Sequence, residues 1–184
     1  MLLDALHDEF AGFLPSERAR VTLRDQVARF YEETRGDVYR YLLTVGLHPP
    51  QAQEAAQEVF LRLYVTLKKG EFIENQRAWV FRVAHNLGLK VRARQDREPP
   101  YDPEIEVRLV DPELNPEQSL LDRERARRFH QAIEGLSEQQ RRCLYLRLEG
   151  LRYTEVGAVL GISPSAVGEF LRRAVVRLKK VTHA

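Results

Sequence analysis

Carboxylates and histidines are the residues of this 184-residue chain that could carry out acid–base or metal-dependent chemistry. Glu54 and Glu58 stand one helical turn apart, and carboxylates at that spacing could together bind a metal ion. The five histidines, at positions 7, 48, 85, 130 and 183, show no metal-ligand spacing. The chain also lacks the glycine-rich phosphate loop, the dinucleotide-binding turn and the serine nucleophile elbow. The sequence therefore predicts that the chain is not an enzyme and has no catalytic residue, bound metal or cofactor.

Cysteine usage and hydropathy indicate the cell compartment. The single cysteine, Cys143, excludes an internal disulfide and a cysteine-based zinc cluster. It lies among leucines, where a buried thiol is more typical than a reactive one. The N-terminus lacks the basic start and long apolar core of a signal peptide, and no apolar run approaches the roughly 18 residues of a membrane span. These features predict a cytoplasmic protein without membrane insertion.

The C-terminal segment carries the start and stop signals of successive helices. Ser137 and Gln140 have the spacing of a capping box, which opens a helix. Gly161 ends a short second helix, and Ser163 and Pro164 are a typical N-cap and first-turn proline for a final one. Two helices joined by a glycine turn, with a longer basic helix second, are typical of a DNA-reading helix-turn-helix. A generic three-helix packing module is the alternative.

Charge is distributed unevenly, although the net charge is only +2. Residues 71–97 have a net charge of +3 and residues 123–184 one of +7, whereas residues 98–122 hold eight acidic side chains and one basic side chain. Basic blocks can pair with nucleic-acid phosphates, but a solvated helix face can also be basic without a partner. Residues 98–118 carry five of the nine prolines and should form an extended linker.

Upstream of the linker, apolar residues recur at helical spacing and predict three helices, over residues 23–46, 51–67 and 77–94. Trp79 stands on the apolar stripe of the third helix, so we expect it in the core rather than as a stacking platform. His85 falls on the polar side of that helix and is expected to face solvent. Residues 2–14 indicate a short additional amphipathic helix. No strand pattern occurs, so the predicted fold class is all-α.

Two groups of motifs together resemble one family. Residues 51–64 (QAQEAAQEVFLRLY) and 77–87 (RAWVFRVAHNL) look like conserved region two of bacterial sigma factors. Residues 136–141 (LSEQQR) and 153–157 (YTEVG), with the final helix, resemble region four. The short linker without an intervening domain is similar to the layout of extracytoplasmic-function (group 4) sigma factors of the sigma-70 family.

The resemblance implies a domain organisation with four parts. Two small helical domains, a region 2 helical bundle and a region 4 helix-turn-helix, would be joined by an extended, acidic, proline-rich linker and preceded by an N-terminal extension. The corresponding ranges are 1–23 for the extension, 24–97 for region 2, 98–118 for the linker and 119–184 for region 4.

The resemblance also implies a function. The chain would be an alternative sigma factor that binds the β′ clamp and β flap of core RNA polymerase, recognises minus-ten and minus-thirty-five promoter DNA, and promotes transcription initiation. The polar face of the second helix would bind core polymerase through Gln53, Glu54, Gln57 and Glu58. The third helix and its preceding loop would bind minus-ten DNA through Asn75, Arg77, Arg82, Asn86, Lys90 and Arg94. The final helix would read minus-thirty-five DNA through Ser163, Ser165, Ala166, Glu169, Arg172, Arg173 and Arg177.

Some residues depart from the family pattern. Gln51 and Gln53 stand where acidic residues are common, which suggests a weaker or differently specified core contact. Gly168 and Glu169 replace a basic-polar pair in the final helix. Glutamate beside phosphate is repulsive unless it accepts a hydrogen bond from a cytosine amine, so the minus-thirty-five sequence is left open.

Family members are typically held inactive by an anti-sigma factor, so such a partner is expected. We assign Leu144, Leu148 and Val159 to the core rather than to that contact. Two other functions are alternatives to that of a sigma factor. A stand-alone helix-turn-helix regulator would explain the C-terminal motifs but not those of residues 51–87. A sigma-like protein that only sequesters an anti-sigma factor would explain the unusual glycine–glutamate pair.

Overall fold

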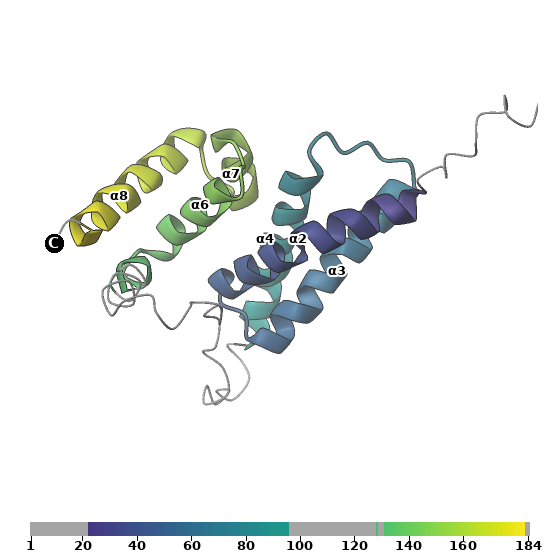
Figure 1. Cartoon of the computed structure of the whole chain (residues 1–184), viewed down its shortest axis with the longest axis horizontal. Helices are drawn as coiled ribbons and strands as arrows, with labels where there is room; N and C mark the ends of the chain where they lie inside the picture. The colour runs from purple at the N-terminus through teal and green to yellow at the C-terminus, as the bar shows by residue number, and fades with distance from the viewer. Residues whose placement is uncertain (1–21, 96–127, 129–130, 183–184) are drawn as a thin grey trace, which may run out of the picture.

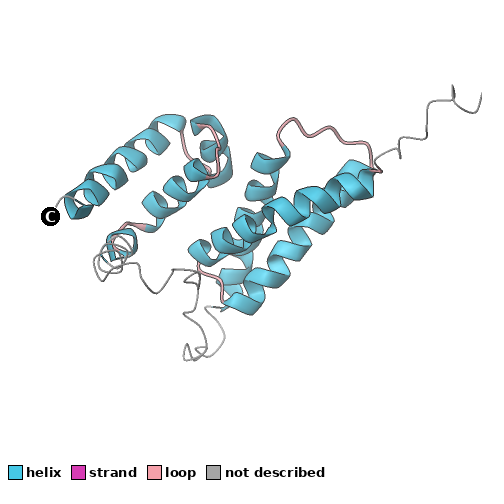
Figure 2. Ribbon diagram, in the orientation of Figure 1, coloured by secondary structure: helices cyan, strands magenta, loops and turns pink. Residues whose placement is uncertain are grey.

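The computed structural model describes residues 22–95, 128 and 131–182, and every regular element among these residues is a helix (Figure 2). The labelled helices are α2 (Leu23–Val45), α3 (Pro49–Lys68), α4 (Gln76–Gln95), α6 (Glu138–Leu148), α7 (Tyr153–Leu160) and α8 (Pro164–Thr182). Figure 1 shows α2, α3 and α4 as one group, the N-terminal half, and α6, α7 and α8 as a second group, the C-terminal half. The predicted all-α class is confirmed.

Local signals set the ends of the first two helices. The Thr22 hydroxyl accepts a hydrogen bond from the Asp25 amide at 3.1 Å, and the Asp25 carboxylate accepts one from the Thr22 amide at 3.0 Å. This capping box starts α2, which ends at Gly46 in the left-handed conformation with φ 107°. Helix α3 begins two residues earlier than predicted, because Pro49 and Pro50 occupy its first turn, where an amide has no helical partner.

The three helices of the N-terminal half pack against one another around the apolar stripe of α3. The buried residues of α3 are Ala52, Ala55, Ala56, Val59, Phe60 and Leu63, as the helical spacing predicts. Gly88 allows α4 to approach α2 closely, since a Cβ atom at this position would lie 3.1 Å from side-chain atoms of both Leu42 and Val45. This packing holds the basic helix α4 firmly on the bundle.

The helix-turn-helix forms where the sequence predicts it. The Ser137 hydroxyl accepts from the Gln140 amide at 3.2 Å, and the Gln140 side chain accepts from the Ser137 amide at 3.0 Å. Gly161, with φ 68°, closes α7. Ser163 then caps α8 by accepting from the Ala166 amide at 3.2 Å. These caps fix the turn between α7 and α8.

The two halves lie side by side, with α2 against α6 and α4 against α7. Most of their buried apolar residues form a single continuous cluster. Within it the Tyr41 ring of α2 and the Tyr145 ring of α6 have centroids 5.7 Å apart. The described part of the chain is therefore one packed unit with a seam between its halves.

Two predictions about individual side chains are wrong. His85 is buried, with 6% exposure, because α2 packs against the flank of α4 that carries it, and the Tyr41 hydroxyl of α2 lies 3.0 Å from His85 Nδ1. Leu148 is 76% exposed, since it is the last residue of α6 and lies beyond the packed faces. Val159 joins the core, and Leu144 and Trp79 are partly buried against it. Cys143 is fully buried, as predicted.

Some predicted segments lie outside the described residues. These are the helix over residues 2–14, nearly all of the N-terminal extension, and the linker over residues 98–118. Among the residues that the structure does describe, none of the helices combines the length and apolar character that crossing a membrane requires.

Candidate functional site

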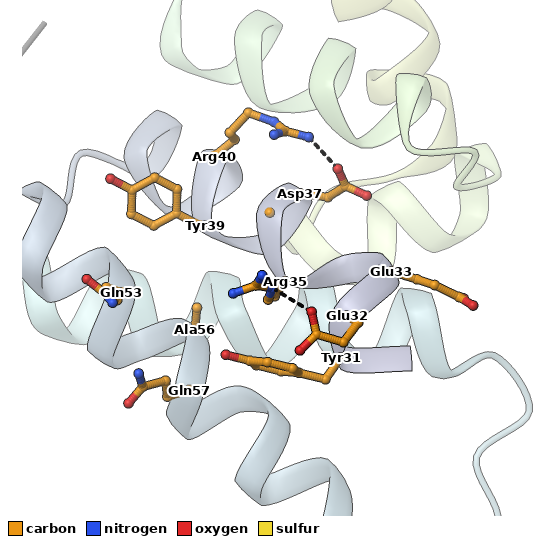
Figure 3. Close-up of a pocket in the computed structure, with 11 residues that line it drawn as sticks. Tyr31, Glu32, Glu33, Arg35, Asp37, Tyr39, Arg40, Gln53, Ala56 and Gln57 are labelled. Atoms are coloured by element: carbon orange, nitrogen blue, oxygen red, sulfur yellow. Dashed lines mark hydrogen bonds and ion pairs between the residues drawn. The ribbon is translucent and has the colours of Figure 1, made fainter. Parts of the chain in front are cut away.

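A groove of about 470 Å³ runs between α2 and α3 (Figure 3). Gln53 and Gln57 of α3 line it, opposite Tyr31, Tyr39 and other residues of α2. Of the remaining two predicted core-binding residues, Glu54 is exposed and Glu58 accepts a hydrogen bond from Arg62 at 2.7 Å. The four predicted residues thus form one polar surface, half of which opens into the groove.

The α2 side of this groove is charged. The Arg35 guanidinium lies 3.2 Å from the Glu32 carboxylate, and that of Arg40 lies 2.5 Å from Asp37, pairs that appear as dashed lines in Figure 3. The Arg35 guanidinium also lies over the Tyr31 ring at 5.7 Å from its centroid. The groove therefore offers both charges and an aromatic surface to a partner.

Helix α4 presents a polar stripe to solvent. Its exposed members are spaced four residues apart, so they share one helix face about 18 Å long; they are Arg82, Asn86, Lys90 and Arg94. Three cations and an amide on one face can pair with successive phosphates and donate to base edges. The structure brings these four predicted residues together.

The remaining two predicted minus-ten residues lie at the N-terminal end of α4 and are already engaged. The Asn75 side-chain oxygen caps α4 by accepting from the Ala78 amide at 3.0 Å, and its amide group donates to the Glu155 carboxylate at 2.7 Å. The Arg77 guanidinium donates to the Asp37 carboxylate at 2.7 Å, to the Glu149 carboxylate, and to the Glu149 carbonyl at 3.0 Å.

The surface of α8 carries the predicted minus-thirty-five residues. Ser163, Ser165 and the arginines at 172, 173 and 177 are exposed, whereas Ala166 and Glu169 are partly buried. The Glu169 carboxylate accepts from Arg172 at 2.9 and 3.0 Å and from Arg173 at 2.7 Å. These hydrogen bonds lower the pKa of Glu169 to about 2, so the carboxylate stays charged and holds both arginines. Sequence reasoning placed Glu169 on this surface but did not foresee that role.

Comparison with known families covers both halves of this arrangement. Residues 30–98 match the family model "Sigma-70 region 2", and residues 126–178 match "Sigma-70, region 4". The chain belongs to the sigma-70 family. Sigma factors are transcription initiation factors without enzymatic activity, so family membership agrees with the prediction that this chain is not an enzyme.

Curated relatives place this sigma factor in the extracytoplasmic-function group. It is 28% identical over 161 residues to the ECF RNA polymerase sigma factor SigK of Mycolicibacterium vanbaalenii, a match that covers 83% of this chain and 80% of SigK. It is 26% identical over 159 residues to the RNA polymerase sigma factor YlaC of Bacillus subtilis, covering 85% and 92% of the two chains.

Two solved structures share the fold. The sigma factor RpoE in complex with the anti-sigma factor NepR from Bartonella quintana has a TM-score of 0.62 at 19% identity, over 87% of this chain and 98% of that one. CnrH in complex with the cytosolic domain of CnrY has a TM-score of 0.55 at 17% identity, over 86% and 88% of the two chains.

In this sigma factor, Arg77 and the carboxylates of Asp37 and Glu149 form a polar cluster at the seam between the two halves. Burial works against the charged guanidinium, but the carboxylates of Asp37 and Glu149 outweigh it and raise the pKa of Arg77. Burial raises the pKa of Glu149, and Arg77 opposes that shift while Asp37 adds to it. The Tyr145 hydroxyl donates to the Asp37 carbonyl at 2.8 Å. One arginine of the region 2 half is thus held between acids of both halves.

A second cluster ties the seam at the end of α2. Arg92 donates to the Glu138 carboxylate through two nitrogens, at 3.0 and 3.1 Å, and to the Val45 carbonyl at 2.9 Å. Arg142 donates to Glu138 at 2.8 Å. Hydrogen bonds from Arg92 lower the pKa of Glu138. Cations here also complement the carbonyl end of the α2 dipole.

Buried polar residues lie between these two clusters. The Tyr41 hydroxyl and His85 Nδ1 are 3.0 Å apart. Burial lowers the pKa of His85 to about 4, and the positive charge of Arg142 acts in the same direction. His85 is therefore neutral at physiological pH, and Tyr41 is its hydrogen-bond partner.

The structure identifies functional contacts that sequence reasoning missed. Asp37, Glu138, Glu149 and Glu155 all hold arginine or amide groups across or beside the seam. Single acidic residues on helices have no distinctive spacing, so the sequence offers no signal for them. Only the approach of segments separated by 40 to 80 positions creates these contacts.

Proposed function

We propose that the chain is an alternative sigma factor that binds core RNA polymerase and recognises minus-ten and minus-thirty-five promoter elements. One observation supports this most strongly: the half that matches region 2 carries an exposed cationic stripe on α4, and the half that matches region 4 carries an exposed recognition helix. A stand-alone regulator would need the second feature but not the first.

Core polymerase would bind the surface formed by Gln53, Glu54, Gln57 and Glu58. The two glutamates suit charge-assisted hydrogen bonds to arginines of the β′ clamp. The two glutamines line the groove beside the aromatic ring of Tyr31, so a long basic side chain could lie along it. The β flap would contact the region 4 half.

Minus-ten DNA would bind along the α4 stripe. Its cations would neutralise phosphates of the melted strand, and Asn86 would add hydrogen bonds to bases or sugars. Asn75 and Arg77 would join once they are released from the acids that hold them. Promoter melting would then use all six predicted residues.

Minus-thirty-five DNA would bind α8. The exposed serines at its start can approach the major groove, while the three arginines contact phosphates or guanines. Glu169 would either accept from a cytosine amine or orient Arg172 and Arg173 for neighbouring bases. The sigma factor RpoE of Bartonella quintana is bound to the anti-sigma factor NepR in its solved structure, and we propose that an anti-sigma factor also binds this chain.

Run-off transcription with reconstituted holoenzyme tests the proposal. Sequencing transcript 5′ ends after overexpression supplies the promoters. We expect promoter-specific products, and Arg82→Ala combined with Lys90→Ala should reduce open-complex yield on the order of ten- to a hundredfold while core binding persists. Arg24→Ala with Lys68→Ala removes the same charge from exposed sites elsewhere and should change little.

Other results would point to the competing functions. Stable core binding without any promoter-specific transcript would favour sequestration of an anti-sigma factor. Promoter DNA binding without co-purification of core polymerase would favour a stand-alone regulator.

A further inference from the structure

Two carboxylates of the C-terminal half occupy the donors at the start of α4. Glu155 of α7 accepts from Asn75, and Glu149, directly after α6, accepts from Arg77. We propose that in the free protein the C-terminal half competes with single-stranded DNA for this end of the N-terminal half. This inference rests on the proposed function, because it takes Asn75 and Arg77 as DNA-binding residues.

The competition follows from the chemistry of the acceptors. A carboxylate and a phosphate both offer anionic oxygens to the same guanidinium and amide donors. Arg77 already donates to two carboxylates and a backbone carbonyl, and it is only about one-third exposed. A phosphate must therefore compete with Glu149 for the Nε and Nη2 donors of Arg77.

The same seam closes the space in front of the α3–α4 loop. A pocket of about 350 Å³ lies there, bounded by Ile73 and Trp79 on one side and by Ala158 and Val159 of α7 on the other. Since α7 forms one of its walls, a base that enters between the loop and α4 meets the C-terminal half. Phe72, at 90% exposure, remains available at the edge of this pocket.

The competition is confined to one end of the candidate DNA surface. We call the arrangement in which Glu149 and Glu155 hold Arg77 and Asn75 the closed state. The stripe from Arg82 to Arg94 stays exposed in the closed state, so it can still attract nucleic acid. The apparent dissociation constant for a strand that needs Asn75 and Arg77 equals the intrinsic value divided by the open fraction. Weakening the closed state should therefore tighten binding of single-stranded DNA.

Cys143 provides a natural reporter of opening. It is the only cysteine of the chain, it is fully buried on α6, and it lies near enough to Tyr41 of α2 to affect the pKa of that phenol. Burial also raises the pKa of its thiol to about 11, which slows reaction further. Separation of α2 from α6 should speed its modification by a maleimide.

The experiment compares the full-length protein with Glu149→Gln and Glu155→Gln. Each change removes one negative charge. At position 155, glutamine can still accept the hydrogen bond from the Arg152 amide that caps α7. Glu134→Gln, at an exposed site away from the seam, is the charge-matched control. The readouts are the rate of Cys143 modification and the affinity for a fluorescein-labelled single-stranded DNA of mixed sequence.

We expect both seam variants to react faster at Cys143 and to bind DNA more tightly than the control, by roughly three- to tenfold, because each loses a charge-assisted hydrogen bond. If DNA affinity rises no more than in Glu134→Gln, the competition is refuted, even where the thiol reacts faster. Neither readout requires polymerase. Failure of promoter-specific transcription would therefore count against the proposed function and not against this closed state.

Discussion

Acidification should destabilise this sigma factor through His85. The folded protein holds the pKa of His85 at about 4, against an ordinary value of 6.5, because the ring is buried against Tyr41 and near Arg142. The unfolded chain therefore takes up a proton at higher pH than the folded chain does. The stability contributed by neutral His85 is fully present above pH 6.5. It is lost as the pH falls towards 4.

The magnitude follows from the two pKa values of His85. Between pH 7 and pH 5 the difference in proton uptake lowers the free energy of unfolding by about 2 kcal/mol, and the full loss below pH 4 is about 3 kcal/mol. Glu149 works in the opposite direction, since its raised pKa lets protonation stabilise the folded state as the pH falls. The contribution of Glu149 is the same in wild type and in a variant at position 85, so it cancels when the two proteins are compared.

Urea unfolding at pH 7 and pH 5 measures the effect. Wild type and His85→Gln are compared, because glutamine keeps a hydrogen-bonding group beside Tyr41 and does not titrate. The fluorescence of Trp79, the only tryptophan, and helical circular dichroism report unfolding. Wild type should lose about 2 kcal/mol more than His85→Gln over this interval. Parallel losses in the two proteins would refute the argument that His85 is held neutral by burial.

Four further substitutions test the packing and the DNA surface. Gly157→Ala should destabilise the protein by roughly 1–3 kcal/mol in urea unfolding, since its Cβ would lie 2.6 Å from the Ile162 carbonyl oxygen. Gly168→Ala meets only ordinary contact at 3.5 Å and should stabilise by up to about 1 kcal/mol; equal effects would contradict the geometry. Leu63→Ala, at a fully buried site, should cost about 2–5 kcal/mol in thermal or urea unfolding. Glu169→Gln should release two arginines and steepen the fall in duplex DNA affinity between 50 and 200 mM salt by about three- to fourfold for each arginine; an unchanged salt dependence in anisotropy titrations would oppose this.

The sequence predicts the helices of this protein well because their ends depend on local chemistry. Ser137 and Gln140 cap the same helix whatever surrounds it, and Gly161 ends α7 through its own backbone conformation. The apolar stripe of α3, which includes Leu63, follows from helical spacing alone. The early start of α3 differs for an equally local reason, the tolerance of prolines in a first turn.

The sequence predicts the candidate DNA and polymerase surfaces only in part. The stripe from Arg82 to Arg94 and the face that includes Gln53 and Gln57 follow from helical spacing and from resemblance to the family. The engagement of Arg77 by Glu149 does not, since the two residues are 72 positions apart and either would look like an ordinary surface charge.

Sequence by itself thus determined the all-α class, the helix ends, the helix-turn-helix and the family. Only the tertiary structure decided which polar residues lie at the seam between the halves. Helical spacing says which residues share a face of one helix, but not how many of its faces neighbouring helices will cover. Helical spacing places His85 on the solvent side for that reason, and it is buried because α2, with Tyr41, packs against the flank of α4 that carries it.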